Sequence, residues 1–322
     1  MRVLVTGGAG FIGSHVSEAL LELGNAVLIY DDFSTGRKIN LDNHEDAQVV
    51  EASILDKEAL QRAVEDVHAV VHLAARPSVA RSIEDPASTN ATNVQGTLNV
   101  LMAARAAGVR RVVQASSSSV YGDRKRWSAD GRTLDLHKRE SQTPSPMSPY
   151  AVSKLAAEQY GVAFSKSMGL DVVALRLFNV FGPRQDPAGG YAAVIPKFIR
   201  AVLEGLPLTI YGNGQQSRDF CYVANVVDAV LKALKADEGA VAGRVFNVAC
   251  DERTTVLEMI EQLHALAGTS LSTIHVDERV GDIRHSLADI SDIGAALRYK
   301  PLVRFPEGLA KTWDWFKERH DD

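Results

Sequence analysis

The sequence predicts an α/β protein in which a doubly wound parallel sheet is followed by a smaller C-terminal α/β domain. From residue 3 to residue 176, short apolar segments alternate with longer amphipathic segments, which is the pattern of parallel strands joined by helices. Beyond residue 177 the segments become shorter, and glycine, proline and turn residues become frequent. We therefore expect a first domain over residues 1–176, to which the chain returns near residues 218–250, and a second domain over residues 177–322.

The first predicted strand leads into a turn rich in glycine. Residues 3–5 are apolar, residues 7–13 read Gly-Gly-Ala-Gly-Phe-Ile-Gly, and an amphipathic helix then runs to about Gly24. In this context of strand, turn and helix, glycines let the backbone approach a pyrophosphate at the helix N-terminus. The order of elements therefore predicts a Rossmann-type sheet that binds a dinucleotide.

An acidic pair ends the next predicted strand. Residues 26–30 are followed by Asp31 and Asp32, about 20 residues beyond the glycines. A carboxylate at Asp31 would accept hydrogen bonds from the adenosine ribose and would repel a 2′-phosphate, which favours NAD over NADP. Asp32 is either a second ribose contact or a solvated loop residue. We interpret Arg37, the one opposing hint, as a loop charge.

The remaining elements of the first domain bring further residues to the same edge of the sheet. We expect strands over residues 49–51, 69–73, 111–115 and 172–176, and helices through residues 60–64, 89–107 and 150–166. Ligands of such sheets bind beyond the carboxyl ends of the strands. The glycine turn, the acidic pair, the small residues at 74–75 and the serine run at 116–119 should therefore meet there.

Tyr150 and Lys154 lie four residues apart at the start of a predicted helix, which places both on one face. Ser148 can cap this helix, and Pro149 suits its first turn. A lysine ammonium beside a phenol favours the phenolate and so lowers the tyrosine pKa. We expect a general base that takes a proton from an alcohol, with a cationic cofactor ring supplying the rest of the charge stabilisation.

The second domain has a less regular pattern. We expect a short helix from Ile195, strands over residues 208–211 and 219–222 around a turn at 212–214, and amphipathic helices over residues 226–234 and 256–266.

Composition excludes several classes of function. The 322 residues are 46% hydrophobic and carry a net charge of −5, so no basic field favours nucleic acid or a membrane surface. Cys221 and Cys250 have neither metal-site nor disulfide-framework spacing. We therefore expect no metal site and a buried strand position for Cys221. Because the sequence shows neither a signal peptide nor a long apolar run, we also expect a cytoplasmic protein.

Several motifs resemble those of the extended short-chain dehydrogenases/reductases and, within them, the NAD-dependent nucleotide-sugar 4-epimerases that act on UDP-hexoses or UDP-N-acetylhexosamines. The similarity rests on residues 117–122, 148–150, 178–182, 217–220 and 281–286. Residues 184–187, 191–197 and 284–289 are especially similar to bacterial UDP-N-acetylglucosamine 4-epimerases. The resemblance implies C4 epimerisation through a 4-keto sugar, with NAD retained by the enzyme.

The resemblance also implies a set of site residues. The catalytic residues would be Ser117, Tyr150 and Lys154. The latter two would also contact NAD, together with Gly7, Gly10, Phe11, Ile12, Gly13, Asp31, Asp32, Ser53, Ile54, Leu73, Ala74, Ala75 and Asn93. The UDP-sugar would contact Ser117, Ser118, Asn179, Ala193, Val194, Tyr211, Arg218, Arg279, Asp282 and Ser286. Ser53 departs from the acidic residue usual in the family beside the adenine.

The serine run distinguishes among related reactions. Dehydratases of this group typically carry an Asp-Glu pair at the positions of Ser118 and Ser119, and UDP-glucuronate decarboxylases carry Glu at the latter. Neither acid is present, which favours simple epimerisation. Ser286 leaves room for an N-acetyl group, whereas Arg76 could pair with a uronate carboxylate. UDP-glucuronate 4-epimerase or decarboxylase therefore remains the alternative.

Three further expectations concern assembly, class and an unusual segment. As in its relatives, helices 89–107 and 150–166 would form a four-helix homodimer interface.

A non-catalytic NAD-binding regulator is the opposing class, but such proteins commonly lack the catalytic Tyr or Lys, which this chain retains. Residues 123–148 form a longer segment than expected, either a lid over the sugar or a solvated surface elaboration.

Overall fold

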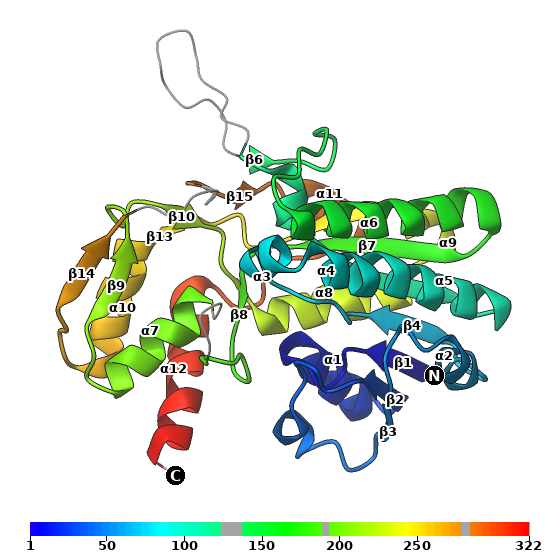
Figure 1. Ribbon diagram of the computed structural model, residues 1–322, viewed down its shortest axis with the longest axis horizontal. Helices are drawn as coiled ribbons and strands as arrows, with labels where there is room; N and C mark the ends of the chain where they lie inside the picture. The colour runs from blue at the N-terminus through cyan, green and yellow to red at the C-terminus, as the bar shows by residue number, and fades with distance from the viewer. Residues whose placement is uncertain (124–136, 189–192, 278–283, 322) are drawn as a thin grey trace, which may run out of the picture.

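The computed structural model describes residues 1–123, 137–188, 193–277 and 284–321 (Figure 1). Residues 124–136, which make up half of the unusual segment 123–148, lie outside the described residues, as do Arg279 and Asp282. In the described part of the chain, no helix is long and apolar enough to cross a membrane.

A seven-stranded sheet with all neighbours parallel forms the centre of the larger lobe, which confirms the predicted fold class. Its order is β12-β7-β5-β4-β1-β2-β3, so the order reverses between β1 and β4. A ligand crevice is expected at such a reversal. The strands are β1 (Arg2–Thr6), β2 (Ala26–Asp31), β3 (Gln48–Glu51), β4 (Ala69–His72), β5 (Arg111–Ser117), β7 (Asp171–Leu177) and β12 (Val245–Val248).

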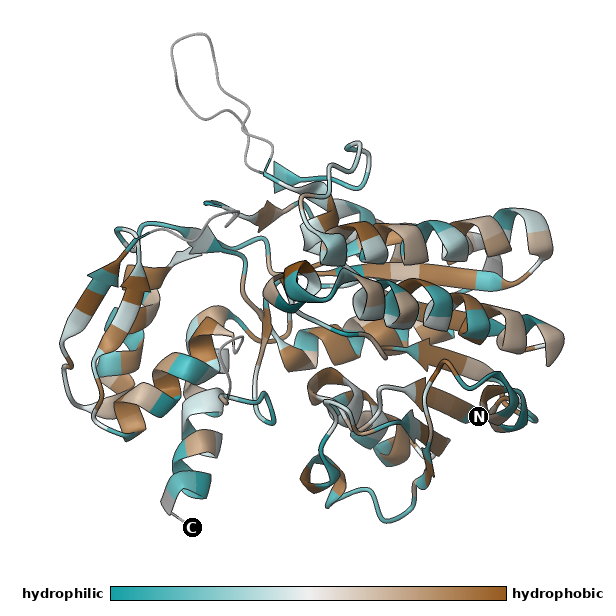
Figure 2. Cartoon of the chain, in the orientation of Figure 1, coloured by the Kyte–Doolittle hydropathy of each residue, from teal (hydrophilic) through white to brown (hydrophobic). Residues whose placement is uncertain are grey.

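Helices cover both faces of the sheet because alternate strand residues point to opposite sides. Val3 and Val5 pack with α1 (Phe11–Glu22), α8 (Val223–Lys235) and α11 (Ser291–Leu297). Leu4 belongs to the opposite core with α2 (Lys57–Ala63), α5 (Thr97–Ala106) and α6 (Pro149–Met168). Figure 2 shows the apolar residues concentrated along these strands. Strands buried on both faces explain the continuous apolar runs of the sequence.

The helix predicted over residues 89–107 is not uniform. It consists of α4 (Pro86–Asn90), a π-helical turn η2 (Ala91–Gly96) and α5. The side chain of Asn93, within this turn, accepts a hydrogen bond from the Arg76 backbone amide at 2.7 Å and donates one to Ser153 Oγ at 2.9 Å. Such π turns are frequent at functional sites, and hydrophobic periodicity does not reveal them.

The smaller lobe packs α7 (Val194–Leu203), α10 (Val256–Ala267) and α12 (Phe305–Asp321) around its own apolar core. The predicted strands around the turn at 212–214 do not pair with each other. β9 (Leu208–Tyr211) pairs in parallel with β14 (Thr273–Val276), and β11 (Cys221–Tyr222) pairs in parallel with β8 (Val180–Phe181). Cys221 is fully buried in its strand, as predicted.

Short elements complete the described chain. They are η1 (Lys38–Leu41), α3 (Val79–Glu84), η3 (Ser118–Tyr121), β6 (His137–Lys138), β10 (Ser217–Arg218), α9 (Glu238–Val241), β13 (Thr254–Thr255) and β15 (Leu287–Ala288). β10 pairs with β13 and β6 with β15. Between the two lobes the chain crosses more than once, since β12 belongs to the large sheet although it follows much of the smaller lobe in sequence.

Candidate active site

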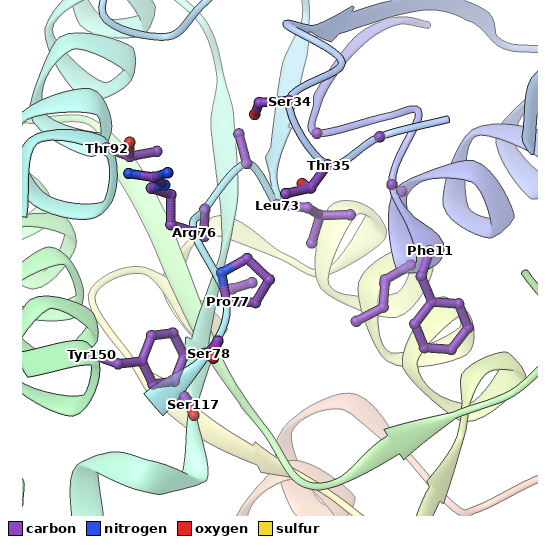
Figure 3. Close-up of a pocket in the computed structure, with 18 of the residues that line it drawn as sticks. Phe11, Ser34, Thr35, Leu73, Arg76, Pro77, Ser78, Thr92, Ser117 and Tyr150 are labelled. Atoms are coloured by element: carbon purple, nitrogen blue, oxygen red, sulfur yellow. The ribbon is translucent and has the colours of Figure 1, made fainter. Parts of the chain in front are cut away.

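A cleft of about 1610 Å³ lies at the carboxyl ends of the parallel strands, where the order of the sheet reverses. It is lined by the turn after β1, the ends of β2 and β5, the segment after β4, the first turns of α6 and residues of the smaller lobe (Figure 3). Its volume exceeds the roughly 300–1,000 Å³ of an ordinary small-molecule pocket. The cleft therefore has room for two ligands of nucleotide size.

Most of the predicted site residues line this cleft. They are Gly7, Gly10, Phe11, Ile12, Gly13, Asp31, Asp32, Ser53, Ile54, Leu73, Ala74, Ala75, Ser117, Ser118, Tyr150, Lys154, Asn179, Ala193, Arg218 and Ser286.

Of the predicted residues that the structure describes, three do not line the cleft. Asn93 lies behind its wall, almost fully buried, where its hydrogen bonds position the chain after β4 instead. Val194 packs against the core of the smaller lobe as the first residue of α7. Tyr211 ends β9, and its carbonyl accepts a hydrogen bond from Gln216.

The glycine turn brings backbone close to backbone. A Cβ on Gly13 would lie 2.0 Å from the Gly7 carbonyl oxygen, and one on Gly7, at φ +70°, would lie 2.7 Å from the Ala74 nitrogen. Only glycine fits either position. Helix α1 begins directly after this turn, with no side-chain cap on its N-terminal amides. The free amides and the exposed backbone fit a pyrophosphate.

Asp31 joins the glycine turn to the loop after β2. Its carboxylate accepts hydrogen bonds from the backbone amides of Ala9 and Phe33, both at 2.9 Å. Burial raises the pKa of Asp31, although these two hydrogen bonds oppose the shift. Asp32 accepts from Ser34 in the exposed part of the loop. The buried position of Asp31 at the strand end suits a carboxylate that faces a ribose.

The predicted catalytic residues meet at the end of β5. Helix α6 is capped by Ser148, which accepts from the Ala151 amide at 3.1 Å, with Pro149 in its first turn. Tyr150 lies beside Ser117, the last residue of β5 (Figure 3). One turn further along, Lys154 donates to the Ala115 carbonyl at 2.6 Å.

This combination of glycine turn, acidic strand end and Ser-Tyr-Lys group agrees with the comparisons. A model of the NAD dependent epimerase/dehydratase family matches residues 3–249. The chain belongs to this family. It is therefore an enzyme that uses NAD, and the resemblance inferred from its motifs is confirmed.

The relatives of this epimerase-family chain act on several UDP-sugars. A UDP-glucose 4-epimerase of Mycolicibacterium smegmatis is 37% identical over 99% of each chain, and a UDP-N-acetyl-alpha-D-glucosaminuronate decarboxylase of Bacillus cytotoxicus is 35% identical over 100% of this chain and 99% of its own. Among solved structures, the UDP-N-acetylglucosamine 4-epimerase of Methanobrevibacter ruminantium has a TM-score of 0.91 at 40% identity and covers 99% and 98% of the two chains. The UDP-glucose 4-epimerase of Thermotoga maritima has a TM-score of 0.92 at 35% identity and covers 99% and 100%.

Burial dominates the electrostatics of the catalytic group. It raises the pKa of Tyr150, an effect that the neighbouring Ser117 side chain only opposes. It lowers the pKa of Lys154 to about 8, which the charge of Glu158 opposes. In the protein chain alone the ammonium of Lys154 donates to the Ala115 carbonyl, and desolvation decides the direction of the Tyr150 pKa. The expected phenolate, which relies on the lysine and on a cationic cofactor ring together, stays a prediction.

Sequence reasoning missed part of the cleft wall. The loop over residues 33–36, the segment 78–81 and residues 185–188 also line it. The first of these directly follows the acidic pair, so its position could have been inferred from the strand end. Residues 185–188 are brought to the cleft by packing, and one of them, Asp186, lies 3.8 Å from the Arg37 guanidinium. In the described residues, no group of three or more His, Cys, Asp or Glu is arranged to hold a metal ion.

Proposed function

We propose that the enzyme interconverts C4 epimers of a UDP-sugar through a transient 4-keto sugar. The observation that carries this proposal is the Ser117–Tyr150–Lys154 group, which lies in the middle of a cleft large enough for a dinucleotide and a nucleotide sugar. Ser118 and Ser119 occupy the positions at which related dehydratases typically carry the acids that eliminate water. The group can therefore move a proton at one sugar hydroxyl without a second acid or base.

Each residue has a defined task in this reaction. Tyr150, as the phenolate, takes the proton from O4 of the sugar, and Ser117 holds O4 by a hydrogen bond. When bound, NAD would supply reversible hydride acceptance at C4 and a positive ring that offsets the cost of a buried phenolate. Tyr150 would return the proton to O4 when the opposite face of the keto sugar is reduced. Lys154 keeps an ammonium beside the reacting groups. The Arg218 guanidinium, with Asn179, suits the diphosphate of UDP.

We propose that the substrates are the epimer pair UDP-GlcNAc and UDP-GalNAc, the epimer pair UDP-Glc and UDP-Gal, or both of these pairs. Ser286 lines the cleft with a small side chain, which supports room for an N-acetyl group. Arg76, the candidate partner of a uronate, lines the cleft, but its guanidinium lies 3.3 Å from the Asp85 carboxylate. That pairing favours a neutral sugar over UDP-glucuronate.

A substrate panel tests the proposal. The purified enzyme is incubated with the UDP conjugates of glucose, N-acetylglucosamine and glucuronate, and the products are separated by chromatography. We expect C4 epimers of the neutral sugars, no steady net reduction of added NAD, and a loss of about 10²–10⁴-fold in rate for Tyr150→Phe with NAD still bound. Conversion of UDP-glucuronate alone, or release of a pentose product, would identify the alternative uronate chemistry. Inactivity on every conjugate with NAD bound would favour a regulator.

We further propose that the chain forms a homodimer through the helices built from residues 86–106 and 149–168. Met102 on α5 and Val152 and Tyr160 on α6 are large apolar or aromatic side chains that are 55%, 52% and 39% exposed. An exposed apolar face of this kind is typical of an interface. Light scattering in solution tests the dimer, and Met102→Glu should shift it towards a monomer.

Two other expectations remain proposals. We keep residues 1–176 as the NAD-binding domain and residues 177–322 as the UDP-sugar-binding domain, with the return through β12. We also propose a cytoplasmic location, supported by the two buried free thiols Cys221 and Cys250, which suit a reducing compartment. Limited proteolysis and fractionation of the source cells test these two points.

A further inference from the structure

A buried carboxylate lies one helical turn beyond the catalytic lysine. Tyr150, Lys154 and Glu158 are spaced four residues apart along α6 and so share one face of the helix. The first two line the cleft, whereas Glu158 has no exposed surface. A fully buried acid is costly unless it is paired and hydrogen-bonded. Its partners therefore show what holds it there.

Three groups satisfy the Glu158 carboxylate. Arg176 of β7 forms a two-point ion pair with it, at 2.9 Å from Nε and 2.7 Å from Nη2. Ser116 of β5 donates to it at 2.7 Å. Gln159 donates a longer hydrogen bond of 3.4 Å. The carboxylate thus joins α6 to β7 and to β5, the strand whose end carries Ser117.

These contacts are adjacent in sequence to the reacting residues. Ser116 directly precedes Ser117, and the residue before it, Ala115, supplies the carbonyl that accepts from Lys154. Two adjacent residues of β5 are therefore held by α6: Ala115 by Lys154 and Ser116 by Glu158. Any shift of the carboxylate moves the strand end that presents Ser117.

The charge of Glu158 also acts on Lys154, although its ion-pair partner is Arg176. Lys154 is almost fully buried, and the titratable groups near it are Tyr150 and Glu158 on α6, His72 on β4 and Arg176 on β7. Burial lowers the pKa of His72 to about 3, so this imidazole is neutral. Burial lowers the pKa of Lys154, and the charge of Glu158 raises it. Glu158 is thus the anion that favours the ammonium.

Arg176 does not explain the position of Glu158 by itself. Its guanidinium also stacks over the Tyr121 ring at 4.6 Å, and Tyr121 donates to Asn247 of β12 at 2.7 Å. Two buried apolar residues could join these strands without the cost of desolvating two charges. A carboxylate beside the catalytic lysine adds what such residues lack, which is a negative charge.

We propose that Glu158 is a positioning residue for the epimerisation, whose carboxylate keeps Lys154 charged and holds the end of β5 that presents Ser117. This inference rests on the proposed function, and the experiment below separates the failure of one from that of the other. It makes a prediction that a purely structural ion pair does not make. The pH dependence of turnover should depend on the charge at 158 even where the fold is intact.

The test compares pH profiles of kcat for the wild type, Glu158→Gln and the double variant Glu158→Gln/Arg176→Met. The single variant leaves the Arg176 cation buried without its partner, so a loss of stability is expected. The double variant removes both charges and should recover most of the melting temperature. In Glu158→Gln, Lys154 loses the anion while the Arg176 cation stays, so its pKa falls and the alkaline limb of the profile should move to lower pH by about one unit. In the double variant, which also removes the cation, the limb should move in the same direction by a smaller amount. Bound NAD, measured by absorbance after denaturation, confirms that the same holoenzyme is compared.

Ser116→Ala separates the two roles. It removes the hydrogen bond to β5 but leaves the charge, so kcat should fall several-fold with no movement of the alkaline limb. A folded double variant with the wild-type alkaline limb would overturn the proposal and leave Glu158 as a structural ion pair only. If the wild type itself converts no UDP-sugar, the proposed function fails. If the wild type is active and the limb does not move, only this inference fails.

Discussion

Two buried aspartates hold the two sides of the cleft, and they do so over different distances along the chain. On the cofactor side, Asp31 accepts from backbone amides 22 and 2 residues away. On the proposed sugar side, Asp219 is fully buried and accepts from the amides of Cys250 and Ala288, which are 31 and 69 residues away. The cofactor side is thus a local structure, whereas the sugar side depends on the packing of three distant segments.

This difference indicates which residues determine ligand specificity on each side of the cleft. The cofactor side is formed largely by backbone atoms of the glycine turn and by small residues after β4, and its geometry follows from where glycine is required. The proposed sugar side is lined by Asn179, Arg218 and Ser286 from three separate segments. We expect the cofactor side to tolerate almost no change in its backbone. We expect single side-chain substitutions on the proposed sugar side to change which sugar binds.

Gly13→Ala should produce the largest effect, on the cofactor side. The added Cβ would lie 2.0 Å from the Gly7 carbonyl oxygen, so the turn must move and the pyrophosphate site is lost. We expect purified protein without NAD, measured as bound nucleotide per chain. Gly239→Ala is the matched control, since its Cβ would meet nothing within 4 Å. Equal NAD content in the two variants would refute the local backbone model.

Asp219 should give the sugar side a pH dependence in stability. Burial raises the pKa of Asp219 to about 7, from an ordinary value of 3.8. Between these values Asp219 holds more protons in the folded chain than in the unfolded chain, so the stability that this one group contributes is greatest below pH 4 and falls as pH rises to about 7. The contribution is at most about 4 kcal/mol. Urea unfolding at a series of pH values should show this fall in the wild type. In Asp219→Asn the part of the slope of stability against pH that comes from Asp219 should be absent, even if the substitution also lowers stability by the same amount at every pH.

Ser286→Tyr should change sugar preference by a smaller amount. A bulky ring at this position would fill the space proposed for the N-acetyl group. We expect kcat/KM for UDP-GlcNAc to fall by about 10–200-fold relative to that for UDP-Glc, measured with both substrates on one preparation. Bound NAD should not change, because the substitution lies on the other side of the cleft. An equal loss with both sugars would show that Ser286 does not border the N-acetyl position.

Arg37→Ala should have the smallest effect. The guanidinium lies 3.8 Å from Asp186 across the cleft, and both side chains are about half exposed. Solvent screening limits such a pair to less than about 1 kcal/mol. We expect a change in melting temperature of no more than a few degrees and no gain in NADP binding, measured by titration. Tight NADP binding by the wild type would instead show that Arg37 accommodates a 2′-phosphate.

The sequence by itself determined the parallel sheet, the dinucleotide turn and the Tyr150–Lys154 pair, because each depends on a short-range rule. Strand and helix periods, the need for glycine at a close backbone approach and the four-residue spacing of a helix face all act within one or two elements. Only the tertiary structure decided the π turn around Asn93, the pairing of β9 with β14 and the position of Glu158 between Arg176 and Ser116. It also decided the sign of the pKa shift of Tyr150, since desolvation depends on what the whole fold packs around a side chain and not on its neighbours in sequence.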